Sequence, residues 1–259
     1  MRLLMIGDVI GRPGRKTVQL NLGELKREYG LSLVIANGEN ASGGTGITGD
    51  AAGELFSYGV DVITSGNHIW DKKEAFKYIV NEKRLIRPAN YPPGLPGHGS
   101  YIFETKDNYR VAVISLSGRA FMPALDCPFR TADDLIKNLK DQADAIVVDF
   151  HAEATSEKIA LGWYLAGRVA AVCGTHTHVQ TADERILPGG TAYITDLGMT
   201  GPYNSVIGSN KDVVIKRFLT QLPMRMEVAP GICQFNGAII EIDETSGEAV
   251  SIDRIQNYE

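Results

Sequence analysis

Short apolar runs recur along the chain and alternate with stretches that have the spacing of amphipathic helices. There are seven such runs: Leu3–Ile6, Leu33–Ala36, Val60–Thr64, Val111–Leu116, Ala145–Val148, Ala170–Cys173 and Ala192–Thr195. Runs this short, with little polar alternation, are typical of buried strands. The pattern therefore predicts seven strands.

Between these runs lie six segments with helical spacing: Arg15–Tyr29, Asp50–Tyr58, Lys72–Asn81, Thr131–Lys140, Ser156–Leu165 and Lys211–Leu222. Gly30 and Gly59 stand where helix C-caps belong. Asp50, Thr131 and Ser156 stand where N-caps belong. Strands that alternate with helices in this way predict an α/β fold.

Two stretches depart from the alternation and predict antiparallel hairpins. One covers Tyr101–Leu116 with a turn near residues 107–108, and the other covers Cys233–Ile255 with a turn near residues 246–247. No linker, repeat or low-complexity segment divides the chain. We therefore predict a single domain over residues 1–259, with two mixed β-sheets packed together and helices outside.

The charge and the cysteines narrow the choice of partners. Acidic residues outnumber basic residues by 31 to 26, so no broad positive surface for long nucleic acid is expected, whereas a small anionic substrate held by metals is compatible. Cys127, Cys173 and Cys233 have no CxxC spacing and indicate neither a disulfide framework nor a zinc knuckle. Few apolar residues precede Asp8, and no stretch approaches the roughly 20 apolar residues of a membrane span. We expect a cytoplasmic protein.

Polar residues that can bind ligands follow five of the predicted strands. They are Asp8, the segment Asn37-Gly38-Glu39-Asn40, the pair Asn67-His68, His151, and the segment Gly174-Thr175-His176-Thr177-His178. The fifth histidine of the chain, His98, lies in a loop rich in glycine and proline, and we assign it no role. Because the loops at the carboxyl ends of strands converge in such folds, the five groups are expected to lie together.

Each of these residues alone has an ordinary interpretation. Asp8 could cap a helix or a turn, and Glu39 could be a polar turn residue. His151 could be a partly buried imidazole with hydrogen-bond partners. The pair His176 and His178 is more specific, because side chains two residues apart in an extended chain point the same way.

A shared site explains the five positions better than independent coincidences do. Imidazole nitrogens, carboxylates and amide oxygens, without cysteine, suit Mn²⁺, Fe²⁺ or Zn²⁺. The candidate ligands are Asp8, Glu39, Asn40, Asn67, His151, His176 and His178. They are too many for one tetrahedral zinc, so we predict two ions that share one carboxylate. Four further acidic residues near these positions are expected to be ordinary caps rather than groups that orient ligands: Asp149, Glu153, Asp183 and Asp196.

The order Gly-Asp, Asn-Gly-Glu-Asn, Gly-Asn-His, a single His and Gly-x-His-x-His resembles the calcineurin-like metallophosphoesterases. It is most similar to their bacterial branch of YmdB-type cyclic-nucleotide phosphodiesterases, over nearly the whole chain. Two departures from the wider family stand out: Ile10 replaces a histidine, and Glu39-Asn40 replaces an aspartate motif. The resemblance implies the calcineurin-like sandwich fold and two divalent or mixed-valence ions, iron first, with manganese or zinc as alternatives.

The resemblance also implies a role for each ligand. Glu39 would bridge the two ions. The first ion would be completed by Asp8, Asn40 and His178, and the second by Asn67, His151 and His176. A hydroxide held between ions roughly 3.5 to 4 Å apart would attack the phosphorus. His68 would protonate the leaving oxygen as general acid, or would instead only position the substrate.

The expected substrate is a small phosphodiester, by resemblance a 2′,3′- or 3′,5′-cyclic nucleotide. A phosphomonoesterase, another two-metal hydrolase, and a regulatory protein that only senses a nucleotide are the alternatives. The segment Gly7–Thr17 matches neither Gly-x-Gly-x-x-Gly nor the P-loop spacing. The glycine-rich loop Ala41–Gly46 and the segment Gly198–Gly201 either border the mouth of the site or are turns. Neither a membrane nor long nucleic acid is an expected partner, and self-association stays open.

Overall fold

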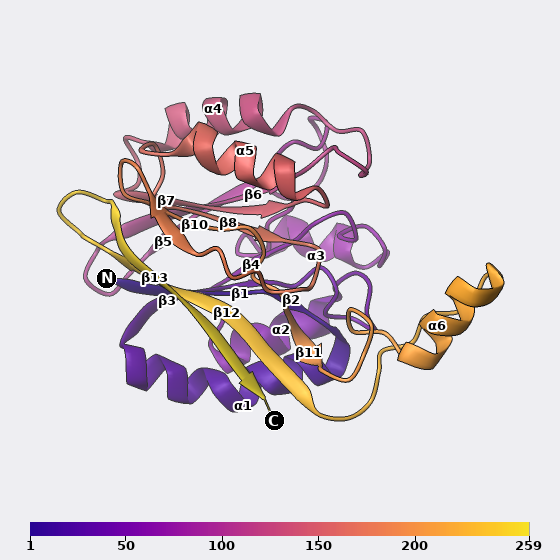
Figure 1. The fold of residues 1–259 in the computed structure, drawn as a ribbon. Coiled ribbons are helices and arrows are strands. Elements are labelled where there is room, and N and C mark those ends of the chain that lie inside the picture. The colour runs from indigo at the N-terminus through magenta and orange to yellow at the C-terminus, as the bar shows by residue number, and fades with distance from the viewer. Residues whose placement is uncertain (259) are drawn as a thin grey trace.

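All seven apolar runs form strands in the structure, a computed structural model that describes residues 1–258 (Figure 1). One sheet has seven strands. In spatial order they are β2 (Asp8–Val9), β11 (Met199–Pro202), β12 (Cys233–Ile242), β1 (Arg2–Ile6), β3 (Leu31–Asn37) and β4 (Val62–Thr64), with β13 (Ala249–Tyr258) also paired to β12. Strands β1, β3 and β4 are parallel, whereas β12 runs antiparallel to β1.

The second sheet has six strands. In spatial order they are β5 (Ser100–Glu104), β6 (Arg110–Ser117), β7 (Ala145–His151), β8 (Ala171–Thr175), β10 (Thr191–Ile194) and β9 (Arg185–Leu187). The four central strands are parallel and the two edge strands are antiparallel. Both predicted hairpins, β5 with β6 and β12 with β13, are present.

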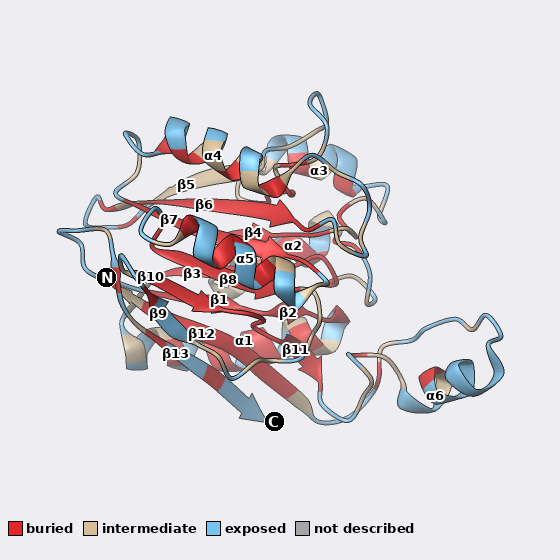
Figure 2. Ribbon diagram, turned by 45° about the horizontal axis from the view of Figure 1, so that its top comes forward, coloured by how far each residue is buried: buried red, intermediate tan, exposed pale blue. Residues whose placement is uncertain are grey.

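Alternate side chains of each central strand face two different apolar layers, which explains why the runs lack polar alternation. Leu3 and Met5 of β1 pack between the sheets, where they share a cluster with Val147. Leu4 and Ile6 pack on the outer face of the same sheet. Figure 2 shows the central strands almost wholly buried.

Helices cover the outer face of each sheet (Figure 1). The bounds are α1 (Gly11–Tyr29), α2 (Gly49–Tyr58), α3 (Ala75–Asn81), α4 (Pro128–Leu139), α5 (Thr155–Leu165) and α6 (Lys211–Thr220). Leu22 of α1 packs against the first sheet, and Leu161 of α5 packs against the second. The predicted fold class, two mixed sheets packed together with helices outside, is confirmed. The assignment of residues 1–259 to one domain stays a prediction.

Helix α6 begins at Lys211 as predicted, but other helix starts differ from the prediction. Helices α1 and α4 begin at Gly11 and Pro128, several residues earlier than expected. Each contains a proline in its first turn, where the missing N–H would have no helical partner, so proline is no barrier there. The N-cap of α2 is Thr48 and not Asp50, since the Thr48 side chain accepts from the backbone N–H of Ala51.

The segment of residues 203–232, which joins β11 to β12 and carries α6, projects from the rest of the chain (Figures 1 and 2). We call this segment the arm. Its two ends pair through the bridge Ser209 to Val228, whereas the bridge Val206 to Ser209 closes a turn within the first end. The base of the arm is therefore tied together. Among residues 1–258, no helix has the length and apolar character needed to cross a membrane.

Candidate metal centre

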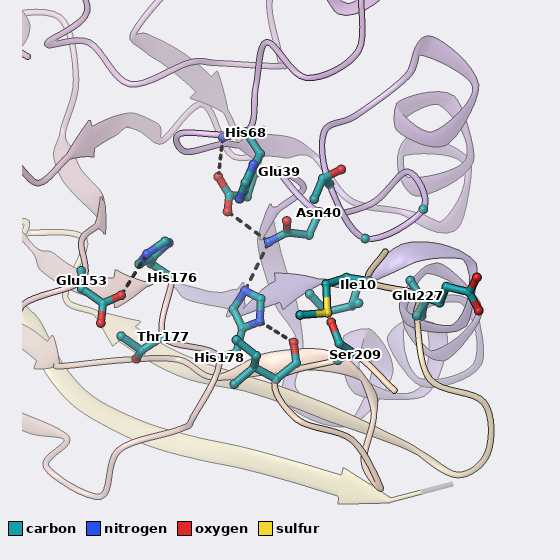
Figure 3. Close-up of a pocket in the computed structure, with 17 residues that line it drawn as sticks. Ile10, Glu39, Asn40, His68, Glu153, His176, Thr177, His178, Ser209 and Glu227 are labelled. Atoms are coloured by element: carbon teal, nitrogen blue, oxygen red, sulfur yellow. Dashed lines mark hydrogen bonds and ion pairs between the residues drawn. The ribbon is translucent and has the colours of Figure 1, made fainter. Parts of the chain in front are cut away.

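The carboxyl ends of five strands bring all seven predicted ligands into one place. Asp8, Glu39, Asn40 and Asn67 follow strands of the first sheet, whereas His151, His176 and His178 lie at the ends of β7 and β8 in the second. Asp8, Glu39 and His151 are wholly buried. Glu39, Asn40, His176 and His178 line one pocket, shown in Figure 3.

His151 lies at the centre of one set of donors. Its Nε2 is 3.0 Å from Oε1 of Glu39, 3.2 Å from Oδ1 of Asn67 and 3.0 Å from Nδ1 of His176. Donor atoms of Glu39, His151 and His176 all lie within 4.8 Å of one another. This distance is compatible with joint coordination of one cation.

The second set shares Glu39 with the first. Its other members are Asp8 and His178, and donor atoms of these three side chains again lie within 4.8 Å of one another. Nε2 of His178 is 3.8 Å from Oδ1 of Asp8 and 3.2 Å from the Asn40 amide. The Asn40 amide also reaches Oε1 of Glu39, at 3.0 Å.

Hydrogen bonds fix which nitrogen of each imidazole can act as a ligand. Nδ1 of His178 donates to the carbonyl oxygen of Ile207 at 2.9 Å, so the lone pair of Nε2 faces the site, next to the Asn40 amide. Nδ1 of His151 lies 2.9 Å from Oγ1 of Thr175. Because that hydroxyl donates to Asp149, it must accept from His151, and Nε2 again faces the site. His176 turns its Nε2 toward Glu153, at 3.1 Å, and presents Nδ1 to the site.

Burial and close charges shift the pKa values of these groups strongly. Burial raises the pKa of Asp8 to about 6. Burial also acts to raise the pKa of Glu39, but the neighbouring His151 outweighs it and lowers this pKa to about 2. For His176, burial and then the adjacent His151 lower the pKa to about 3, so this imidazole is neutral.

The arrangement fits cations better than it fits a hydrogen-bonded protein interior. Oδ1 of Asp8 is buried without a hydrogen-bond partner, although buried carboxylates normally have one. Donor atoms of three imidazoles and two carboxylates converge on the same small region, as they do around bound cations. The donor set of nitrogen and oxygen, without sulfur, suits Mn²⁺, Fe²⁺ or Zn²⁺.

Ile10, which replaces a family histidine, offers no donor. Its side chain is 3% exposed and packs where side chains on Gly201 or Gly208 would collide with it. The set around Asp8 therefore contains one imidazole, that of His178, whereas the set around Asn67 contains two.

A cavity of about 500 Å³ opens from the two donor sets. His68 lines it, and its Nδ1 lies 2.8 Å from Oδ2 of Asp71. The glycine-rich loop borders the cavity through Gly43, Gly44 and Thr45, whereas the segment 198–201 does not line it. The base of the arm also lines the cavity, at Ile207–Ser209 and Met226–Val228.

His98 lies outside this cavity, as expected for a residue without an assigned role. Besides Glu153, which lies 3.1 Å from Nε2 of His176 and so orients a proposed ligand, two more acidic residues that we expected to be ordinary caps are instead part of the support of the site. Asp149 is 1% exposed and accepts hydrogen bonds from Thr175, Asn37 and Thr64. It therefore orients the Thr175 hydroxyl that holds His151.

The second is Asp196, which is wholly buried and accepts from Lys158 and from Thr177. The supporting role of Asp149 could have been predicted from the sequence. Residues two apart in a strand lie on the same face, so Asp149 lies on the same face as the predicted ligand His151. For Lys158, a charged residue on a helix, the sequence contains no comparable signal.

The chain matches the family described as YmdB-like protein over residues 4–255. It belongs to this family. It is 52% identical, over 98% of its own length and 96% of the relative's, to the 2′,3′-cyclic-nucleotide 2′-phosphodiesterase of Bacillus subtilis. The relationship confirms the resemblance and the predicted enzyme class, a phosphodiesterase, and family membership implies a divalent metal.

Two solved structures share the fold over the whole chain. A crystal structure of a hypothetical protein from Thermus thermophilus has a TM-score of 0.94 at 43% identity, and each chain covers 100% of the other. A protein from Mycoplasma pneumoniae, described as a novel phosphatase, has a TM-score of 0.93 at 37% identity, with 100% of this chain and 93% of that one covered. The fold of this chain is therefore shared, over its whole length, with two solved structures, one of them described as a phosphatase.

Proposed function

We propose that the chain is a two-metal phosphodiesterase that hydrolyses 2′,3′-cyclic nucleotides and also accepts 3′,5′-cyclic nucleotides. The observation that carries the proposal is the sharing of Glu39 between two donor sets, next to a buried Asp8 oxygen that has no hydrogen-bond partner. Asp8, Asn40 and His178 complete one metal site, and Asn67, His151 and His176 complete the other. Iron is the first choice of metal, with manganese or zinc as alternatives.

When bound, the two ions supply a strongly nucleophilic water and neutralise the charge of the phosphate. The protein holds the ligands in place before the substrate arrives. Glu39 is fixed from two sides, because its Oε2 accepts from the backbone N–H of His68 and its Oε1 accepts from Asn40. A ligand set held in this way loses little freedom on binding, which favours a defined geometry at the phosphate.

His68 is the proposed general acid. Asp71 holds its Nδ1, so Nε2 is the nitrogen that can give a proton to the departing ribose oxygen. In a cyclic substrate this oxygen stays attached to the product and needs a proton but no exit route. Figure 3 shows His68 beside Glu39, on the wall of the cavity.

The rest of the cavity suits a nucleoside. Apolar side chains of Ile207, Met226 and Val228 form one wall, and the backbone of Gly43 and Gly44 forms another. Apolar side chains beside glycine backbone give a lining that suits a largely apolar base. The substrate of the B. subtilis relative supports the same class.

Elemental analysis combined with a substrate panel tests the proposal. Protein purified without chelator should contain about two equivalents of iron or manganese. It should hydrolyse 2′,3′- and 3′,5′-cyclic AMP and bis-p-nitrophenyl phosphate. A His68→Ala variant should keep its metals and lose turnover, because the acid is removed and the ligands remain.

Other outcomes identify the alternatives. Faster hydrolysis of p-nitrophenyl phosphate than of the diesters would make the chain a phosphomonoesterase. Tight binding of cyclic nucleotide without turnover by the metal-loaded protein would make it a nucleotide sensor. Self-association and a cytoplasmic location stay predictions.

A further inference from the structure

A buried ion pair lies behind the proposed metal centre. Lys158, on α5, is 1% exposed, and Asp196, which follows β10, is 0% exposed. Nζ of Lys158 lies 2.6 Å from Oδ2 of Asp196. The lysine chain passes over Gly174, where an added Cβ would lie 1.8 Å from the Thr195 carbonyl oxygen and 3.0 Å from Cδ of Lys158. Gly174 thus leaves room for the ammonium to reach the carboxylate.

Asp196 holds the short segment that carries two of the proposed ligands. Its Oδ2 accepts from the backbone N–H of Thr177 at 3.0 Å and from the Thr177 hydroxyl at 2.6 Å. Thr177 lies between His176 and His178. The carboxylate therefore anchors the residue from which both imidazoles extend.

That anchor acts on a strained backbone. His176 has a φ of 98° and His178 a φ of 65°, in the left-handed region that residues other than glycine rarely adopt. Such conformations persist only where the surroundings hold them. Thr177 lies between these two left-handed residues. Its two hydrogen bonds to Asp196 can therefore hold the backbone of both histidines in this conformation.

The same carboxylate reaches the opposite side of the centre. Its Oδ1 accepts from the backbone N–H of Gly198 at 2.8 Å, and the carbonyl of Gly198 accepts from the backbone N–H of Asp8 at 3.0 Å. Asp8 in turn accepts from the backbone N–H of His176 at 3.0 Å. Asp196 is thus connected to the ligand segments of both sheets.

We propose that Lys158 and Asp196 are positioning residues, which keep His176 and His178 in the conformation that binds the two metals. Removing two charges from water is costly, and an apolar pair of similar size often gives equal or better stability. Stability alone therefore does not account for this pair, whereas its bonds to Thr177 and Gly198 do. The inference rests on the proposed metal centre.

Three variants of the full-length chain test the inference: Lys158→Met, Asp196→Asn and the double variant. Each is loaded with Mn²⁺ and equilibrated with a competing chelator, and the retained Mn²⁺ is measured by electron paramagnetic resonance. We expect each single variant to bind Mn²⁺ about 10 to 100 times more weakly, as when other groups that orient ligands are lost. The double variant leaves no unpaired buried charge and should recover melting temperature but not affinity.

A matched control separates positioning from general destabilisation. Leu161→Ala truncates a wholly buried side chain on the same helix, packed in the outer cluster and not against Thr177. It should lower the melting temperature and leave the Mn²⁺ affinity of the folded protein unchanged. If the Lys158 and Asp196 variants behave like this control, the pair is structural only and the inference is wrong.

The two levels of failure are distinguishable. Wild-type protein that binds no Mn²⁺ and contains no other metal as purified would overturn the metal centre and this inference together. Wild-type protein that binds two ions, with variants that bind them equally well, would overturn only the positioning role.

Discussion

His151 and Glu39 meet across the two sheets, with Nε2 of the imidazole 3.0 Å from Oε1 of the carboxylate and neither side chain exposed beyond 1%. Burial acts to lower the pKa of His151, but the charge of Glu39 outweighs it, with help from Asp8, and raises this pKa to about 9. In the absence of a cation the pair is therefore an imidazolium and a carboxylate at pH 7. A proton occupies the position where a metal would bind.

Metal binding should displace that proton. A ligating imidazole must be neutral at its donor nitrogen, and a group with a pKa of about 9 is protonated at pH 7. We expect about one proton to be released per chain at pH 7. The apparent affinity should rise from pH 7 to 9 and become level above, because the imidazole is then already neutral.

Calorimetric titration of Mn²⁺ in two buffers with different ionisation enthalpies measures this release. Asp8, whose pKa burial raises to about 6, is largely ionised at pH 7 and contributes little. Heats that are independent of the buffer at pH 7 would contradict the prediction.

Glu39→Gln should remove both ions, because the side chain belongs to both donor sets. Changing a group that only orients a ligand commonly lowers metal affinity or activity by about 10 to 100 times. Removing a ligand that both ions share should therefore lower metal affinity by more than about 100-fold. Metal content and diesterase rate give the result. Glu24→Gln, a matched change at an exposed position of α1, should alter neither. Retention of one full equivalent by Glu39→Gln would show that Glu39 is not shared.

The fold could be predicted because the central strands are buried on both faces. Val147 and Val148 face different apolar layers, so β7 appears in the sequence as an uninterrupted apolar run. Strand β11 could not be predicted in this way. It contains Gly201 and Pro202, which have low strand propensity, and it exists because it pairs with β2 and β12.

The ligands could be predicted because they follow strands, and the carboxyl ends of parallel strands meet at one edge of a sheet. Apart from Asp149, the residues that hold the ligands in place could not be predicted, because their contacts leave no periodic pattern in the sequence. Lys158 faces the interior only because Asp196, 38 positions away, lies opposite it. Asp71 holds His68 across a turn, at a spacing that carries no signal by itself.

Asp71→Asn should slow the reaction without removing metal. The carboxylate lies 2.8 Å from Nδ1 of His68 and holds the imidazole in the orientation that leaves Nε2 for the substrate. We expect kcat to fall about 10-fold or more, since general acid–base catalysis contributes about 10²–10⁴-fold. Measurement of kcat and of metal content in the same samples checks both parts.

Asp71 should also act only through His68. The double variant His68→Ala with Asp71→Asn should therefore be no slower than His68→Ala alone. Asp141→Asn, at an exposed position after α4, is the matched control and should leave kcat unchanged. Additive losses in the double variant would assign Asp71 a separate role.

Two glycine substitutions should have opposite effects. An added Cβ on Gly66, which follows β4, would lie 2.1 Å from Cδ2 of His151 and 2.3 Å from Oε2 of Glu39. Gly66→Ala must therefore displace the two central ligands, and we expect it to lose most bound metal and to destabilise the fold by about 1–3 kcal/mol.

Gly53, within α2, has no atom within 4 Å of the corresponding position. Gly53→Ala should keep its metal and gain about 0.5–1 kcal/mol from the helix preference of alanine. Thermal unfolding measures the change in stability of both variants, and elemental analysis measures their bound metal. Full metal occupancy in Gly66→Ala would mean that His151 and Glu39 do not need their present spacing to bind metal.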